Sequence, residues 1–184
     1  MENDVIKENL IEIWRELEKT QWISSSGVSM RPLIAEGMEV ALQFSKFDRI
    51  QLGHIIAFKK GKDMIVHRVI GFWSRHHDQY VIEKGDNNPH CTLIPSSWVL
   101  GRVTMIRYGQ KVINLKNPLW RLIDFLFVLY GWIFTGLFGS LYSIKKLIFG
   151  SQKTQWSQGV YKILMEIFLF LPRNVVRLLK KFKP

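Results

Sequence analysis

Twenty consecutive residues, Phe125–Ile144, carry no charged side chain, and this run limits the folds open to the chain more than any other feature. As an α-helix it would be about 30 Å long, which matches the hydrocarbon thickness of a bilayer. Gly131, Gly136 and Gly139 would weaken a soluble helix but are common in membrane helices. A chain of 184 residues has little core in which to hide such a segment. Residues 117–148 are therefore predicted to form a transmembrane or membrane-inserted segment, with a buried core helix or an in-plane hairpin as the alternatives.

Charge divides the chain at about the same place. Met1–Gln110 has 14 basic and 13 acidic residues, whereas Lys111–Pro184 has 12 basic and 2 acidic residues. Residues 149–184 combine an apolar stripe with interleaved Lys and Arg, which predicts a basic amphipathic helix on an anionic membrane surface. No base-reading motif is present, so membrane lipids are favoured over nucleic acid as the partner. We expect the protein to be membrane-associated, and the flanking charges do not decide which side of the membrane the rest of the chain faces.

The remaining residues read as a soluble domain. Residues 1–20 contain six acidic residues and no apolar leader core, which predicts an amphipathic helix rather than a secretory signal. Residues 21–116 contain short β-type runs separated by turn signals, with no helical pattern between them, and this favours a mainly β, antiparallel domain. The predicted strands are Glu39–Phe44, His54–Phe58, Met64–Phe72, Tyr80–Glu83 and Trp98–Tyr108.

Three short stretches of this domain carry residues capable of chemistry. Ser29 lies in Ser-Gly-Val-Ser-Met-Arg-Pro, His67 in Ile-Val-His-Arg-Val-Ile-Gly, and Asp86 in Glu-Lys-Gly-Asp-Asn-Asn. A serine hydroxyl needs a base within hydrogen-bond reach to become a nucleophile, and a histidine is the usual base. Each residue also has a plain structural interpretation: a loop serine, a packed histidine and a turn aspartate.

Taken together and in this order, the three stretches closely resemble the signal peptidase I superfamily, in particular the endoplasmic-reticulum and archaeal branch that uses histidine where the bacterial branch uses lysine. The resemblance covers roughly residues 22–107. It implies a β-rich protease domain in which Ser29 is the acylating nucleophile and His67 is the general base. It also implies that Asp86 occupies the acidic position, where it either orients His67 or supports the site.

The chain departs from the family pattern at several positions. Gly27 replaces the serine that usually lies two residues before the nucleophile, so backbone donors or Ser26 would have to stabilise an oxyanion. The residues after the Gly-Asp-Asn box, Pro89–Pro95, contain no acid, which leaves open a Ser-His dyad or a triad completed by Asp86. The family's N-terminal membrane anchor is also absent, and the apolar segment follows the domain instead.

These observations lead to one main hypothesis and one alternative. The main hypothesis is a membrane-associated serine endopeptidase that cleaves signal- or leader-type peptides or preproteins through an acyl-enzyme. The alternative is a catalytically degenerate member of the family that serves as a membrane-bound binding or scaffold protein. No cofactor and no metal are expected, because the only cysteine, Cys91, and the histidines near it match no familiar ligand spacing.

Overall fold

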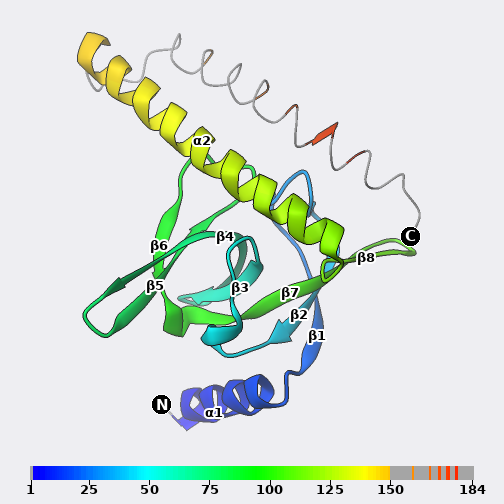
Figure 1. The fold of residues 1–184 in the computed structure, drawn as a ribbon. Helices are drawn as coiled ribbons and strands as arrows, with labels where there is room; N and C mark the ends of the chain where they lie inside the picture. The colour runs from blue at the N-terminus through cyan, green and yellow to red at the C-terminus, as the bar shows by residue number, and fades with distance from the viewer. Residues whose placement is uncertain are drawn as a thin grey trace.

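The computed structural model describes residues 2–149 and, beyond them, only six single positions. The basic amphipathic helix expected over 149–184 therefore lies outside the described residues. The described chain is a strongly curved antiparallel sheet with one helix on each side, α1 (Glu2–Glu16) and α2 (Pro118–Phe149) (Figure 1). The prediction of a mainly β, antiparallel domain with an N-terminal helix and a C-terminal apolar helix is confirmed.

Eight strands form one sheet in the order β1-β2-β7-β3-β4-β5-β6, with β8 paired to β7. Short turns and two 3-10 helices, η1 (Phe47–Arg49) and η2 (Ser96–Trp98), connect them. The strands are β1 (Thr20–Ser24), β2 (Glu39–Phe44), β3 (Ile55–Lys60), β4 (Asp63–Arg75), β5 (Asp78–Lys84), β6 (Thr92–Pro95), β7 (Val99–Tyr108) and β8 (Lys111–Asn114). All five predicted strands are present, and β2 has the predicted bounds, whereas β1, β6 and β8 were not predicted.

The N-terminal helix packs on the sheet by a narrower face than its apolar residues suggested. The Trp14 and Phe44 rings meet edge to face with their centroids 4.9 Å apart, and Arg15 Nη2 donates to the Val99 carbonyl over 2.6 Å. Ile13 and Leu17 remain 51% and 71% exposed, so the sheet covers only part of the apolar surface of this segment.

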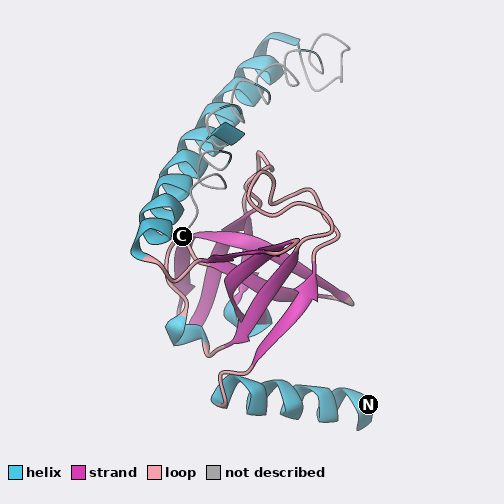
Figure 2. Cartoon of the chain, turned by 90° about the vertical axis from the view of Figure 1, so that its right-hand side faces the viewer, coloured by secondary structure: helices cyan, strands magenta, loops and turns pink. Residues whose placement is uncertain are grey.

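The apolar segment forms one continuous helix that lies against the sheet on the side opposite α1, as both views show (Figures 1 and 2). It is therefore not a hairpin. Within the described residues one stretch, Pro118–Ser143, is long and apolar enough to cross a membrane. One face of this stretch completes the main core: Trp120, Ile123 and Phe127 are buried together with residues of β2, β3, β7 and the loop that follows β1.

Polar contacts also join α2 to strand β4. The sheet register shifts between Val69 and Gly71, so Ile70 is an extra residue of β4 with no opposite partner on β5. The indole Nε1–H of Trp132 donates to the Ile70 carbonyl over 2.8 Å, which satisfies a backbone group that a bulge would otherwise leave unpaired. The side chain of Trp132 on α2 thus compensates for the irregular pairing of β4 at Ile70.

Candidate active site

Ser29 and His67 meet at one end of the curved sheet. Ser29 lies in the loop after β1, and its Oγ is 3.0 Å from Nε2 of His67, which is in the middle of β4. The loop is held in place because Met30 and Leu33, directly after the serine, are buried in the core formed with α2. The two groups lie 38 residues apart along the chain and are within the distance expected of a nucleophile and its base.

Glu83, rather than Asp86, is the acid beside the histidine. The Glu83 carboxylate accepts a hydrogen bond from His67 Nδ1, and both side chains are largely buried, with 6% and 13% exposure. A carboxylate at Nδ1 keeps the proton on that nitrogen, which leaves the Nε2 lone pair directed at the Ser29 hydroxyl. The three side chains form a serine–histidine–glutamate arrangement.

The register of the sheet explains this pairing. Glu83 on β5 is directly opposite Val69 on β4, and Val69 and His67 point to the same face because side chains alternate along a strand. Glu83 and His67 are therefore diagonal neighbours, a distance that long side chains bridge. Glu83 lies two residues before the Gly-Asp-Asn box in the sequence, but recognising that it pairs with His67 required the strand pairing.

Asp86 is placed beside Arg68 instead. Its two oxygens receive hydrogen bonds from Arg68 Nε and Nη2 over 2.8 and 2.9 Å, a bidentate ion pair. The prediction that Asp86 orients His67 is wrong, because Arg68 follows His67 on β4 and so points to the opposite face of the sheet. Of the two roles considered for Asp86, the geometry leaves the supporting one.

Arg68 connects the site to helix α2. It is fully buried, donates to the Gly53 carbonyl over 3.0 Å, and forms a second ion pair with Asp124 of α2. Burial alone would lower the pKa of Arg68, but the carboxylates of Asp86 and Asp124 outweigh that effect and raise its pKa above the ordinary value. Arg68 therefore stays charged and holds the Asp86 turn, the β4 strand and α2 together.

The turn after β5 approaches Ser29 and His67 closely. Asn87 N–H donates to the Ser29 carbonyl over 2.7 Å, and the Asn87 side chain donates to the Val28 carbonyl over 3.2 Å. A Cβ at Gly85 would lie 2.8 Å from the Ser29 carbonyl oxygen and 3.0 Å from His67 Nε2. Only glycine fits there without moving Ser29 or His67, so this turn fixes their relative position.

Lys84 is buried on the other face of the same strand end. Its Nζ donates to the Gly85 carbonyl over 3.2 Å and lies 5.0 Å from the ring centroid of Phe134 on α2. Burial first, and then the Arg68 charge, lower the pKa of Lys84 to about 8, although Asp86 opposes the shift. Lys84 thus carries a charge at neutral pH, and the carboxylate of Asp86 partly balances it.

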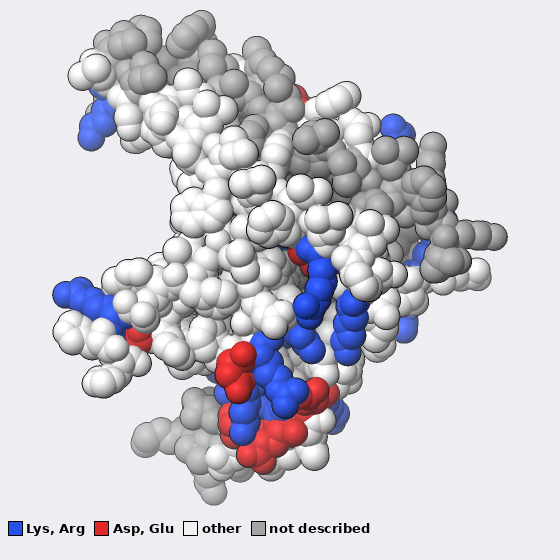
Figure 3. Space-filling view, in the orientation of Figure 1, with Lys and Arg blue, Asp and Glu red and all other residues white. Residues whose placement is uncertain are grey.

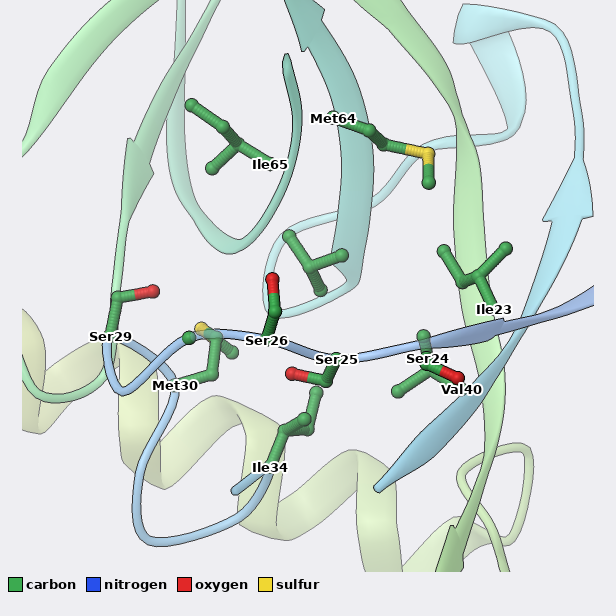
Figure 4. Close-up of a pocket in the computed structure, with 12 residues that line it drawn as sticks. Ile23, Ser24, Ser25, Ser26, Ser29, Met30, Ile34, Val40, Met64 and Ile65 are labelled. Atoms are coloured by element: carbon green, nitrogen blue, oxygen red, sulfur yellow. The ribbon is translucent and has the colours of Figure 1, made fainter. Parts of the chain in front are cut away.

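A small cavity opens beside the serine. Its volume is about 190 Å³, and residues from β1, the Ser29 loop and the beginning of β4 line it (Figure 4). The hydroxyls of Ser26 and Ser29 point toward this space, and the walls are formed by the side chains of Ile23, Ile34 and Ile65 (Figure 4). The volume suits one or two small apolar side chains rather than a large ligand.

Two strand edges border the cavity. Among the strands that the structure describes, β1 pairs only with β2, and β5 joins β4 only from Arg68 onward. Met64–Val66 therefore has no described partner on the side away from β3. Unpaired strand edges present N–H and C=O groups to an incoming chain. An extended peptide could therefore lie between them with its backbone hydrogen-bonded and one side chain in the cavity.

Donors for an oxyanion are available close to Ser29. In the part of the chain that the structure describes, the Ser29 N–H has no hydrogen-bond acceptor, and the peptide on its carboxyl side is fixed by the Asn87 bond. Ser26 lines the cavity, as the expectation of a shifted side-chain donor requires. Both groups suit the charge that develops on a carbonyl oxygen under attack by Ser29.

Comparisons with known proteins add no assignment. A scan against family models gave no match, and a search of curated proteins gave no significant relative. The resemblance to the signal peptidase I superfamily therefore stays a prediction that depends on the three motifs. The absence of a cofactor and of a metal likewise stays an expectation from the sequence.

Proposed function

We propose that this protein is a membrane-associated serine endopeptidase that cleaves extended peptides or preproteins through an acyl-enzyme. One observation carries the proposal: Ser29 Oγ lies 3.0 Å from His67 Nε2, while Glu83 accepts a hydrogen bond from the other ring nitrogen. A merely structural serine or histidine does not require this order of three groups beside an apolar cavity. The motif order in the sequence supports the same reaction class.

The chemistry follows from the three groups. In the first step His67 Nε2 takes the proton of the Ser29 hydroxyl as Oγ bonds to the scissile carbonyl carbon, and the imidazolium is stabilised by Glu83. The C–N bond then breaks, and His67 returns the proton to the leaving amine. Water, deprotonated by the same imidazole, attacks the ester and releases Ser29.

The cavity and the strand edges support a substrate class. An extended segment lying between the β1 and β4 edges would place a small apolar side chain in the 190 Å³ space beside Ser29. Leader-type peptides with small residues before the cleaved bond meet that requirement. Bulky side chains at this position would clash with Ile34 and Val40, which close the cavity.

The test uses the purified full chain in vesicles and a pool of defined synthetic peptides, with products identified by mass spectrometry. We expect Ser29→Ala and His67→Ala each to lower cleavage by at least ~10³-fold, because the two residues act as one unit. Ser74→Ala, which removes an exposed hydroxyl on β4 far from the cavity, is the matched control and should cleave normally. Normal cleavage by folded Ser29→Ala would refute the proposal.

A second experiment identifies the substrate. The Ser29→Ala variant, produced in the native host, should retain uncleaved peptide that the wild-type chain releases. The control is the double variant Ser29→Ala, Val40→Trp, in which the added indole fills the cavity. Peptides that are enriched on Ser29→Ala and absent from this control would be the natural substrates.

A further inference from the structure

Helix α2 has two apolar faces, and the sheet covers only one of them. The inner face packs on the domain through Trp120, Ile123, Phe127, Val128, Phe134 and Phe138, all of which are buried. The outer face of α2 consists of nine apolar or aromatic side chains that are between 37% and 58% exposed. These residues are Leu119, Leu122, Phe125, Leu126, Leu129, Trp132, Ile133, Leu137 and Leu141.

The outer face is too large to be an ordinary exposed patch. Its members recur every three or four residues along about six turns of helix, so they form one continuous stripe. Soluble monomers rarely expose contiguous apolar patches of more than a few hundred Å², and larger ones mark contact with a membrane or a partner. In Figure 3 charged side chains gather around α1 and β1, whereas the visible surface of α2 is uncharged along most of its length.

The docking of the inner face decides how α2 can meet a bilayer. Between Trp120 and Phe138 the helix is fixed to the domain by apolar packing, by the Asp124–Arg68 ion pair and by the Trp132–Ile70 hydrogen bond. If α2 crossed the bilayer, strand β4 and the charges attached to it would have to enter the hydrocarbon layer. That placement is costly for any unpaired polar group, so a docked α2 can meet lipid only along its side.

The charges of α2 favour lipid as the occupant of the outer face. Asp124 is the only acidic residue between Pro118 and Phe149, and it is turned inward to Arg68. The exposed charges at and near the helix, Lys116, Arg121 and Lys146, are all basic. A helix with one side of Leu, Phe and Trp and with flanking Lys and Arg suits the boundary between acyl chains and anionic headgroups.

We propose that α2 lies flat in the surface of an anionic membrane, with its outer face among the acyl chains and the β domain on the aqueous side. The proposal does not depend on the chemistry of Ser29. It replaces the transmembrane reading of residues 117–148 by an in-plane one. It also places the Ser29 loop, which packs on the inner face, about one helix diameter of 10–12 Å from the lipid.

Depth measurements test the orientation directly. Cys91 is the only cysteine, so Cys91→Ser gives a cysteine-free full chain into which single cysteines can be introduced. Spin labels would be attached at Leu119→Cys, Leu126→Cys, Ile133→Cys and Leu141→Cys, in vesicles containing phosphatidylglycerol and phosphatidylcholine. We expect all four to lie at one depth, about 5–10 Å below the headgroups. Depths that change progressively along the helix and pass through the bilayer centre would overturn the proposal in favour of a crossing.

A matched control lies on the other side of the domain. Leu17, at the end of α1, is also apolar and is 71% exposed, but α1 lies opposite α2 (Figures 1 and 2). A label at Leu17→Cys should remain in water with and without vesicles. Equal insertion of Leu17 and the α2 positions would mean nonspecific adsorption and would contradict the proposal.

Binding measurements separate lipid from protein occupants. The double variant Leu126→Gln, Ile133→Gln should lower partitioning into the same vesicles by at least ~10-fold, because two large side chains lose their transfer into lipid. Leu17→Gln should not change it. Two results would overturn the proposal. If the labels on the outer face are shielded in a lipid-free monomer, residues 150–184 cover that face. If the same labels are shielded in a lipid-free dimer, a second copy of the chain covers it.

Discussion

Gly85→Ala is the sharpest structural test of the site, because it changes the chemistry of none of the side chains that the proposed mechanism uses. The added Cβ would lie 2.8 Å from the Ser29 carbonyl oxygen, 2.8 Å from Asn88 Nδ2 and 3.0 Å from His67 Nε2. Gly85 is not among the glycines with positive φ, so alanine can adopt the backbone conformation and the effect is steric. The substitution acts on the spacing of the nucleophile and the base.

The size of the effect follows from these contacts. Ordinary contact with a Cβ begins near 3.4 Å, so Nε2 must retreat by about 0.4 Å and the Ser29 oxygen by about 0.6 Å. The Ser29 carbonyl is hydrogen-bonded to Asn87, which belongs to the same turn, so it cannot move alone. Since a misplacement of 1 Å can cost ~10²-fold in rate, we expect kcat/KM to fall by about 10- to 100-fold. Overpacking should also lower the free energy of unfolding by about 1–3 kcal/mol.

The assay compares kcat/KM for one cleaved peptide with the midpoint of urea unfolding. Gly136→Ala is the control, since a Cβ at Gly136 has no neighbour within 4 Å and the residue lies on exposed α2. A crystal structure of Gly85→Ala should show the Ser29–His67 distance increased. Wild-type kcat/KM in a folded Gly85→Ala protein would refute the view that this turn sets the catalytic geometry.

Three further predictions concern neighbouring charges. Glu83→Gln should lower kcat by about 10²- to 10⁴-fold with little change in KM, and Glu83→Asp should retain part of the activity that Glu83→Gln loses. The downfield Nδ1–H resonance of His67 should be lost in Glu83→Gln, and an unchanged resonance would contradict the role of Glu83. Folding lowers the pKa of Lys84 to about 8, so the unfolded chain binds more protons than the folded chain between pH 8 and 10.5. The free energy of unfolding, measured with urea, should therefore rise by up to about 3 kcal/mol across that window in the wild type. Lys84→Met should show no such rise. Burial, together with the charges of Arg102 and Arg121, lowers the pKa of His54 to about 4, and His54 Nδ1 accepts a hydrogen bond from the Gln51 N–H. The free energy of unfolding should therefore fall by about 2 kcal/mol as the pH drops from 6.5 to 4. His54→Gln should reduce this pH dependence, and an unchanged slope would refute the assignment to His54.

The sequence was sufficient for the elements whose pattern is local. Alternation of apolar residues predicts β2 at its observed bounds, and the motif order predicts the pairing of Ser29 with His67. The strands that were not predicted, β1, β6 and β8, have five, four and four residues. Strands this short carry too little alternation to stand out from a loop, and they exist because a neighbouring strand pairs with them.

The acid beside His67 could not be predicted from the sequence, because its identity depends on the register of the strands. The Gly-Asp-Asn box drew attention to Asp86, but a shift of one residue in strand pairing reverses which side chains share a face. The observed register puts Glu83 on the face of His67 and leaves Asp86 with Arg68 on the other. The bulge at Ile70 is a further irregularity of this strand pair, and no sequence pattern predicts it.

Consecutive residues on β4 connect the two halves of the molecule. His67 faces Ser29 and Arg68 faces α2, so the same short piece of backbone carries both the proposed base and the buried charge that binds Asp124. Removing one partner of a buried ion pair typically costs several kcal/mol, because the other charge stays buried without compensation. Loss of α2 would therefore uncover Arg68 and also remove the packing behind Met30 and Leu33, which hold the Ser29 loop. The sequence predicts a membrane segment over 117–148, yet the inner face of this helix is part of the structure that positions Ser29 and His67.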